Sequence, residues 1–271
     1  LSENTTMIGK ILGSGQLGKL ASFVSPAFFD VMPMRALLGR ARKLVAQSRD
    51  GAKLREALTG RAAALESAMP QLRLSPHVEP PGTASTYDAE WRGNQIVELY
   101  FRQLFLEGPT LLDLRASAFS TDGNTLRWAP AAWLADWSPD FIQPLRALYR
   151  AFYSHDDAQF RQALTALCLA HSEDLFREQF GAGQDRVQFQ VRAFIDVFHR
   201  VFERCKQHGT SLHPDFLPLG IYLAALYDHE QELGVPIDVA SAFQRATRSE
   251  PSTQATAELP RERASQERPD A

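Results

Sequence analysis

The feature that most constrains the fold of this chain is the stretch from Phe216 to Tyr227, which contains no charged residue. A helix that is apolar on every side has no face for water, so this segment is expected at the centre of a helical bundle. Asp215 is placed to be its N-cap, and Pro218 falls in the first turn, where a missing N–H breaks no helical hydrogen bond. Charged residues return directly after Tyr227, and Gly234 predicts the end of the helix.

Apolar residues recur at helical spacing over most of the chain. The clearest example runs from Val187 to Cys205, where one stripe is built of Val, Phe, Ile and Cys. A Phe-rich stripe at this spacing is typical of a core rather than of a cofactor site. Helices are expected at residues 33–68, with a break near 48–51, and at 88–106, 139–153, 155–169, 172–179, 185–208, 215–233 and 237–247.

Residues 108–128 have a different character. Two runs rich in Thr, Leu and aromatic residues flank Asp122-Gly123, and an Asp-Gly between two such runs is a β-hairpin signal. The fold class expected is therefore mainly α, a helical bundle domain with one β-hairpin at about residues 108–128.

The domain organisation is predicted from shifts in composition. Residues 1–68 form a glycine-rich lead-in and a basic helical segment, and 69–86, with their clustered prolines, form a linker. The helical core domain with the hairpin is expected at 87–248. Residues 249–271 have almost no large apolar side chains and are expected to be a disordered tail.

The overall charge and the cysteine count exclude some classes of protein. The net charge is −3, which gives no general signal for nucleic-acid binding. Two cysteines do not make a disulfide framework, and no apolar run reaches the length of about 18 residues that a membrane-spanning helix needs. No secretory signal is evident. We therefore expect a cytoplasmic protein, either free or peripheral to a membrane.

One basic segment stands out against this acidic average. Between Arg35 and Arg61 there are eight basic and two acidic residues, preceded by several Phe and Met residues. Basic residues beside an aromatic segment predict that residues 23–61 contact an anionic membrane surface or a protein partner. The alternative is an ordinary solvated helix face that covers a core.

The glycines near the N-terminus resemble a phosphate-binding loop. Gly13, Gly15 and Gly18 form a G-x-G-x-x-G pattern, and Lys19 follows at the position of a P-loop lysine. Such loops hold phosphate with backbone N–H groups, so these four residues are candidates for ATP–magnesium binding. However, Leu20 replaces the hydroxyl that binds magnesium, and no second strand ends in an acid about 20 residues later. The alternative is a flexible lead-in.

Two cysteine–histidine pairs could form a metal site. Cys168 with His171, and Cys205 with His208, each place a thiol and an imidazole three residues apart. On neighbouring helices the two pairs could close a Cys2His2 zinc site. The alternative is that the histidines lie at helix ends for reasons of the helix dipole, while the cysteines act as small apolar residues on apolar stripes.

Several segments between residues 100 and 239 are similar to a known family. A helix ending at Gly108 is followed by Leu111-Leu112-Asp113-Leu114, then by the Asp122-Gly123 turn. Further on, residues 148–156 form a helix ending in Asp, and residues 206–216 read as a helix, a loop and a Pro-initiated helix. Together these segments resemble the C-terminal part of the AarF/UbiB atypical protein-kinase family.

The resemblance implies a degenerate kinase-like C-terminal lobe. Asp113 is the one match to the family's catalytic loop, whose asparagine is replaced by Ala118. The Asp-Phe-Gly metal loop is absent, with residues 127–130 near its place, and no Lys–Glu pair is found upstream. Phosphoryl transfer depends on such metal-holding groups, so the resemblance implies no catalytic residue and no cofactor.

Three hypotheses on function follow. The first is a non-catalytic, pseudokinase-like helical domain that binds a protein partner or a membrane surface. The second is a helical enzyme or carrier with a buried apolar pocket for a lipid or prenyl-like ligand, which the Phe- and Tyr-rich central helices suggest. The third is a zinc-stabilised interaction module. No motif of a hydrolase or metalloprotease is present.

Overall fold

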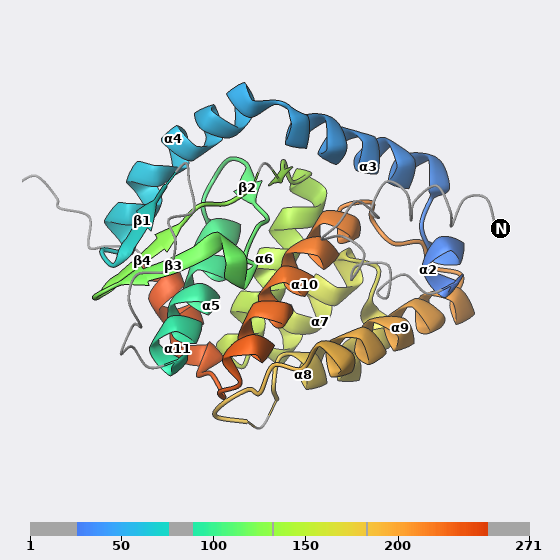
Figure 1. The fold of residues 1–271 in the computed structure, drawn as a ribbon. Coiled ribbons are helices and arrows are strands. Elements are labelled where there is room, and N and C mark those ends of the chain that lie inside the picture. The colour runs from blue at the N-terminus through green and yellow to red at the C-terminus, as the bar shows by residue number, and fades with distance from the viewer. Residues whose placement is uncertain (1–25, 76–88, 132, 183, 249–271) are drawn as a thin grey trace, which may run out of the picture.

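The computed structural model describes residues 26–75, 89–131, 133–182 and 184–248 (Figure 1). Residues Gly13, Gly15, Gly18 and Lys19, most of the predicted linker and the predicted tail lie outside the described residues. The fold is mainly α with small sheets, as predicted.

The predicted helices are present, and most of their ends differ by a few residues from the expected ones. The helix expected at 185–208 begins only at Val191, because Val187 pairs with Ile237 in an antiparallel β-bridge instead of starting the apolar stripe. The break in the basic segment falls at Asp50, whose carboxylate accepts hydrogen bonds from the backbone N–H groups of Ala52 and Lys53 and so caps the second helix. The helices are α2 (Pro26–Val31), α3 (Met34–Arg49), α4 (Gly51–Ala68), α5 (Ala89–Phe105), α6 (Pro139–Tyr153), α7 (Asp157–Ala166), α8 (Glu173–Gln179), α9 (Val191–Gln207), α10 (Phe216–Leu233) and α11 (Val239–Thr247).

Helix α10 lies at the centre of the molecule, as its lack of charge predicted (Figure 1). It contacts α5, α9, α3 and the short 3-10 helix η2 (Ala116–Ala118). The helix ends at Gly234, which takes up a left-handed conformation with φ 70°. Beyond the uncharged stretch, however, the chain does not turn to solvent. His229 and Glu230 are as deeply buried as the apolar residues before them.

Asp215 occupies the N-cap position of α10, but its side chain does not cap the helix. Its carboxylate is buried and lies 2.6 Å from the guanidinium of Arg40 on α3. It also accepts a 2.8 Å hydrogen bond from the backbone N–H of Ser138, at the start of α6. Asp215 therefore links three helices, because a buried carboxylate is stabilised more by a cation than by its own helix end.

The predicted hairpin is present but shorter than expected. Strands β3 (Phe119–Asp122) and β4 (Thr125–Trp128) pair in an antiparallel manner around Gly123, which has φ 53°. Residues 112–118 were expected in the first strand of the hairpin but form a loop followed by η2. The preceding β2 (Thr110–Leu111) instead pairs with β5 (Leu134–Ala135).

Part of the range predicted as a linker is a strand. β1 (Leu72–Leu74) pairs with β4 in parallel and gives the sheet order β1-β4-β3. Leu72 is fully buried, so its side chain contributes to the core instead of lying in a free connection. The alternating Leu-Arg-Leu segment has a strand pattern and can pair with the free edge of β4. The prolines that predicted a linker follow this segment in the sequence, so they do not interrupt the pairing.

The basic segment shares the core of the rest of the chain. Figure 1 shows α3 and α4 arching across the top of the molecule. Leu37, Leu44 and Leu65 from these helices belong to the same buried cluster as the central helices. Arg61 is buried and donates a 2.6 Å hydrogen bond to the carbonyl of Gly108, just past α5. The segment is therefore an integral part of the fold.

Replacing Asp215 tests how much the link between three helices contributes to stability. Asp215→Ala leaves the guanidinium of Arg40 without its buried partner, so the free energy of unfolding should fall by about 3 kcal/mol. Urea unfolding followed by circular dichroism measures this change. The matched control is Asp196→Ala, because Asp196 is exposed on α9 and its loss should cost less than about 0.5 kcal/mol. Equal effects of the two substitutions would contradict the proposed role of Asp215.

Candidate functional site

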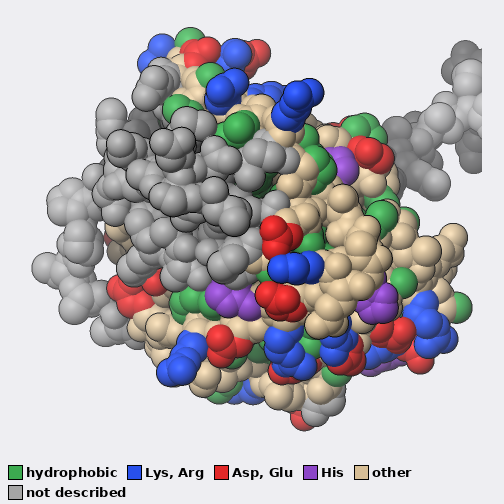
Figure 2. Space-filling view, turned by 90° about the vertical axis from the view of Figure 1, so that its right-hand side faces the viewer, with side chains coloured by type: hydrophobic (Ala, Val, Ile, Leu, Met, Phe, Trp, Pro, Cys, Tyr) green, Lys and Arg blue, Asp and Glu red, His purple; other side chains and the backbone are tan. Residues whose placement is uncertain are grey.

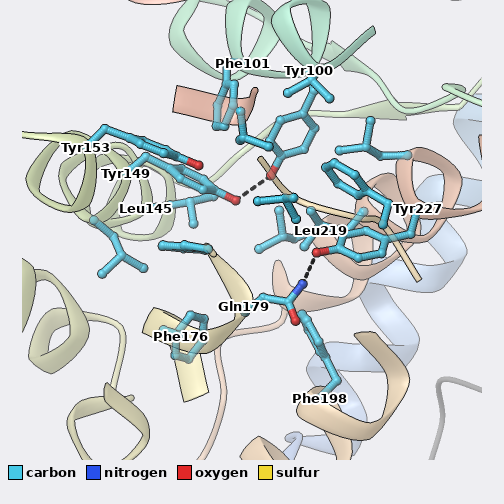
Figure 3. Close-up of a pocket in the computed structure, with 18 of the residues that line it drawn as sticks. Tyr100, Phe101, Leu145, Tyr149, Tyr153, Phe176, Gln179, Phe198, Leu219 and Tyr227 are labelled. Carbon is cyan, nitrogen blue, oxygen red and sulfur yellow. Dashed lines mark hydrogen bonds between the residues drawn. The ribbon is translucent and has the colours of Figure 1, made fainter. Parts of the chain in front are cut away.

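An apolar pocket of about 60 Å³ lies among the central helices (Figure 3). Helices α5, α6, α8, α9 and α10 all contribute side chains to its wall, and no charged side chain is among the described residues that line it. Phe176, Phe198 and Leu223 are among the lining residues that are only partly buried, and the pocket is partly open rather than enclosed. Concave sites with apolar walls and few polar groups are the usual places where small molecules bind.

Helical spacing places the lining residues on common faces. Tyr149 and Tyr153 are four residues apart on α6, and Leu219, Leu223 and Tyr227 repeat at the same spacing on α10. These are positions of the aromatic-rich helices that suggested an apolar pocket from the sequence. This spacing places the side chains on the one side of each helix that lines the pocket.

Ring contacts fix the aromatic walls of the pocket. The ring of Tyr149 stacks on Phe180 with centroids 4.9 Å apart, and Tyr227 stacks on Phe194 at 4.5 Å. Tyr100 lies edge-on to Tyr149, with centroids 6.2 Å apart. Such pairs add to the stabilisation from burial and hold each ring in one orientation.

The polar atoms of the pocket come from tyrosine hydroxyls and one amide. The hydroxyls of Tyr100 and Tyr149 share a 2.7 Å hydrogen bond, and the side-chain amide of Gln179 is hydrogen-bonded to the hydroxyl of Tyr227. Burial raises the pKa of Tyr149 to about 12, and it also raises the pKa of Tyr100 and Tyr227. All three phenols are therefore neutral at ordinary pH. Sequence reasoning missed Gln179, because a lone glutamine on a short helix carries no recognisable pattern.

A second cluster of polar groups lies further along α10. His229 and Glu230 are buried there, and the guanidinium of Arg92 on α5 acts electrostatically on both. The Nδ1–H of His229 donates to the carbonyl of Leu114 at 2.8 Å, which leaves Nε2 without a hydrogen-bond partner. Neither carboxylate oxygen of Glu230 has a partner in the described part of the chain.

Burial shifts these two groups in opposite directions. It raises the pKa of Glu230 to about 8, a shift that the charge of Arg92 partly offsets. It lowers the pKa of His229 to about 3, and the charge of Arg92 lowers it further. At neutral pH the carboxyl is therefore protonated and the imidazole is neutral. Sequence reasoning missed this arrangement, because charged residues after an apolar stretch normally mark its exposed end.

The buried carboxyl should make stability depend on pH. Between the ordinary pKa of 4.5 and the native value of about 8, the folded chain keeps a proton that the unfolded chain has lost. The contribution of Glu230 to the free energy of unfolding should therefore fall by about 3–5 kcal/mol as the pH rises through this window. Below about pH 6.5 the buried His229, whose pKa is lowered, acts in the opposite direction, so the net decline should be seen mainly between about pH 6.5 and 8. Glu230→Gln, which cannot ionise, should remove this decline, whereas Glu232→Gln on the exposed side of α10 should not. Urea unfolding at several pH values measures the free energy of unfolding of each variant. If this free energy changed with pH in the same way in the wild type and in Glu230→Gln, the assignment of the decline to Glu230 would be wrong.

Asp113, which the kinase resemblance singled out, is buried next to Arg115. Its Oδ1 lies 2.6 Å from the Nε of Arg115, and its Oδ2 accepts a 2.8 Å hydrogen bond from the backbone N–H of Ala131. Its carbonyl accepts a hydrogen bond from the indole of Trp128. Asp113 thus fixes the loop between β2 and η2. Its match to the aspartate of the catalytic loop of the AarF/UbiB family stays a prediction.

Three of the four residues predicted to bind zinc lie next to one another, with His171 in contact with both Cys205 and His208. The Nε2 of His171 lies 3.4 Å from the Sγ of Cys205, and the rings of His171 and His208 stack at 4.7 Å. Burial and the nearby Cys168 raise the pKa of the Cys205 thiol to about 11, so it is protonated. Within the described residues, no group of three or more His, Cys, Asp or Glu side chains is arranged to hold a metal ion. The zinc site stays a prediction.

The basic segment has fewer available cations than its composition suggests. Arg40 is paired with Asp215, Lys43 lies 3.1 Å from Asp136, and Arg61 is buried. Exposed basic side chains remain on α3 and α4 at Arg35, Arg42 and Arg55, and at Lys53, whose ammonium group lies 3.8 Å from the carboxylate of Asp50. Binding of an anionic membrane or a partner through residues 23–61 stays a prediction, and these four side chains are the ones that would carry it.

A second, open cleft of about 250 Å³ lies between the end of α5 and the start of α6. Two of its three charged groups are already engaged, because Arg146 donates to backbone carbonyls at the end of α5 and Asp136 pairs with Lys43. The third, Glu107, is exposed. The apolar pocket is therefore the stronger candidate site.

Comparisons with known proteins do not assign the chain to a family. No protein-family model matches the chain, and no curated protein matches it with significance. No helix in the described ranges has both the length and the apolar character needed to cross a membrane.

Proposed function

We propose that this protein binds a small apolar group in the pocket between α5, α6, α8, α9 and α10, and that it acts as a binding protein or carrier. The observation that carries this proposal is a partly open pocket with apolar walls and neutral polar groups among the central helices. Removing apolar surface from water provides the binding free energy, and the fixed aromatic rings mean that little order is lost on binding.

The size of the cavity limits the ligand. About 10–15 Å³ of such space holds one water molecule, so a cavity of about 60 Å³ accommodates a group of about five heavy atoms. This is the tip of a chain or a small ring, not a whole lipid. A longer lipid or prenyl-like ligand would insert its end and leave the rest outside the pocket.

Cyclopentane is a suitable probe because its five CH2 groups match this space. At about 0.8 kcal/mol for each buried CH2 group, its binding free energy is about −4 kcal/mol, which corresponds to a dissociation constant of about 1 mM. The methyl groups of Val97 and Leu219 line the pocket, so their NMR resonances should shift in a saturable manner during a titration.

Filling the pocket should abolish this binding. Leu223 lines the pocket and is partly buried, so Leu223→Trp places an indole where the probe would lie and should weaken cyclopentane binding by about tenfold or more. Leu217→Trp is the matched control, because Leu217 is also partly buried on α10 but does not line the pocket. No saturable shift in the wild-type protein, or equal binding to both variants, would overturn the proposal.

A further inference from the structure

Some hydrogen-bond donors in the pocket have no acceptor in the described part of the chain. The hydroxyls of Tyr100 and Tyr149 carry two hydrogens, but only one of them can lie in the 2.7 Å contact between the two oxygens. Neither hydroxyl has another acceptor in the described part of the chain. Both side chains line the pocket and are buried, so water on the outside does not reach this pair freely. One phenolic hydrogen is therefore left for whatever occupies the pocket.

A second donor comes from Gln179 and Tyr227. Their single hydrogen bond uses one hydrogen, whichever end of the amide faces the hydroxyl, and the pair has three polar hydrogens in total. Figure 3 shows the hydroxyls of Tyr149 and Tyr227 pointing toward the middle of the pocket from facing sides. The donors are thus presented to a ligand from two walls.

The pocket also discriminates against charge. The described residues that line it include no Asp, Glu, Lys, Arg or His, so an ion would lose its hydration without gaining a counter-ion. The phenols stay protonated at ordinary pH, because burial raises the pKa of each. They therefore act as neutral donors.

We infer that the ligand of this pocket is an uncharged molecule whose apolar part carries an acceptor oxygen, as in a ketone, ester, ether or alcohol. The inference rests on the proposed function and adds the chemical class. A hydrocarbon would fill the same space but would leave the spare phenolic hydrogens unpaired, and an unpaired buried donor is unfavourable.

Cyclopentanone tests the inference, because it differs from cyclopentane by one carbonyl group. The double variant Tyr100→Phe/Tyr149→Phe removes both hydroxyls of the pair, so no unpaired partner is created and the ring volumes stay nearly the same. It should weaken cyclopentanone binding by about threefold to tenfold, the effect of one hydrogen bond, and should not weaken cyclopentane binding. NMR titrations of the lining methyl groups measure both constants. Cyclopentylammonium and cyclopentanecarboxylate should not bind.

Tyr222→Phe is the matched control. The hydroxyl of Tyr222 is engaged by the amide of Gln103 and by the carbonyl of Tyr100, and Tyr222 is not among the lining residues. This variant should not change the ratio of the two affinities. Unfolding temperatures of all variants without ligand confirm that they fold.

The outcomes separate the two claims. Failure of cyclopentane to bind the wild-type protein would overturn the proposed function itself. If cyclopentane binds but the double variant weakens both probes equally, or neither, the pocket is an apolar site without recognition of oxygen and this inference is wrong. Binding of either charged probe as tightly as cyclopentanone would also overturn it.

Discussion

The burial of α10 is the constraint on which the rest of the structure depends. Its middle part carries no charge, so the other helices must surround it, and the chain supplies them from both of its halves. At its start, Asp215 is held by Arg40 from α3, a residue far away in the sequence. At its other end, burial continues past the apolar stretch and includes His229 and Glu230. The helix is thus fixed at both ends by polar groups that water does not reach.

The pocket follows from how aromatic residues pack around this helix. Aromatic rings prefer stacked or edge-on contacts with one another, and these contacts restrict the positions that the rings can take. Tyr100, Tyr149 and Tyr227 are each held by a neighbouring ring or hydroxyl, so none can turn freely to fill the gap between them. A pocket with fixed walls and fixed hydroxyls results, and this preorganisation favours binding.

The sequence predicted the local structure well because that structure depends on local periodicity. Helix α6 was expected at residues 139–153 and has those bounds, and Asp122-Gly123 forms the turn of the hairpin. Pairings between distant segments could not be read in this way. Nothing near Leu72–Leu74 indicates that these residues join β4, because the pairing depends on where the hairpin lies in three dimensions.

The same limit applies to the site. The aromatic helices suggested a pocket, but the role of Gln179 depends on how α8 meets α10, which no spacing within either helix encodes. The burial of Glu230 was missed for a related reason. Its carboxyl fits because Gly93 on α5 has no side chain, and a Cβ atom there would lie 2.5 Å from the carboxyl oxygen. Only the packing of two helices distant in sequence makes such a position available.

Helix α10 therefore serves two sites that are close together along its axis. Tyr227 lines the pocket, and Glu230 follows it by three residues, nearly one helical turn. Glu230 packs closely against Gly93 on α5, where an added Cβ atom would lie 2.5 Å from its carboxyl oxygen. Helix α8 is short and carries the partly buried Phe176 and Gln179. We therefore expect adjustment to a ligand to occur in α8, while α10 and its buried carboxyl stay in place.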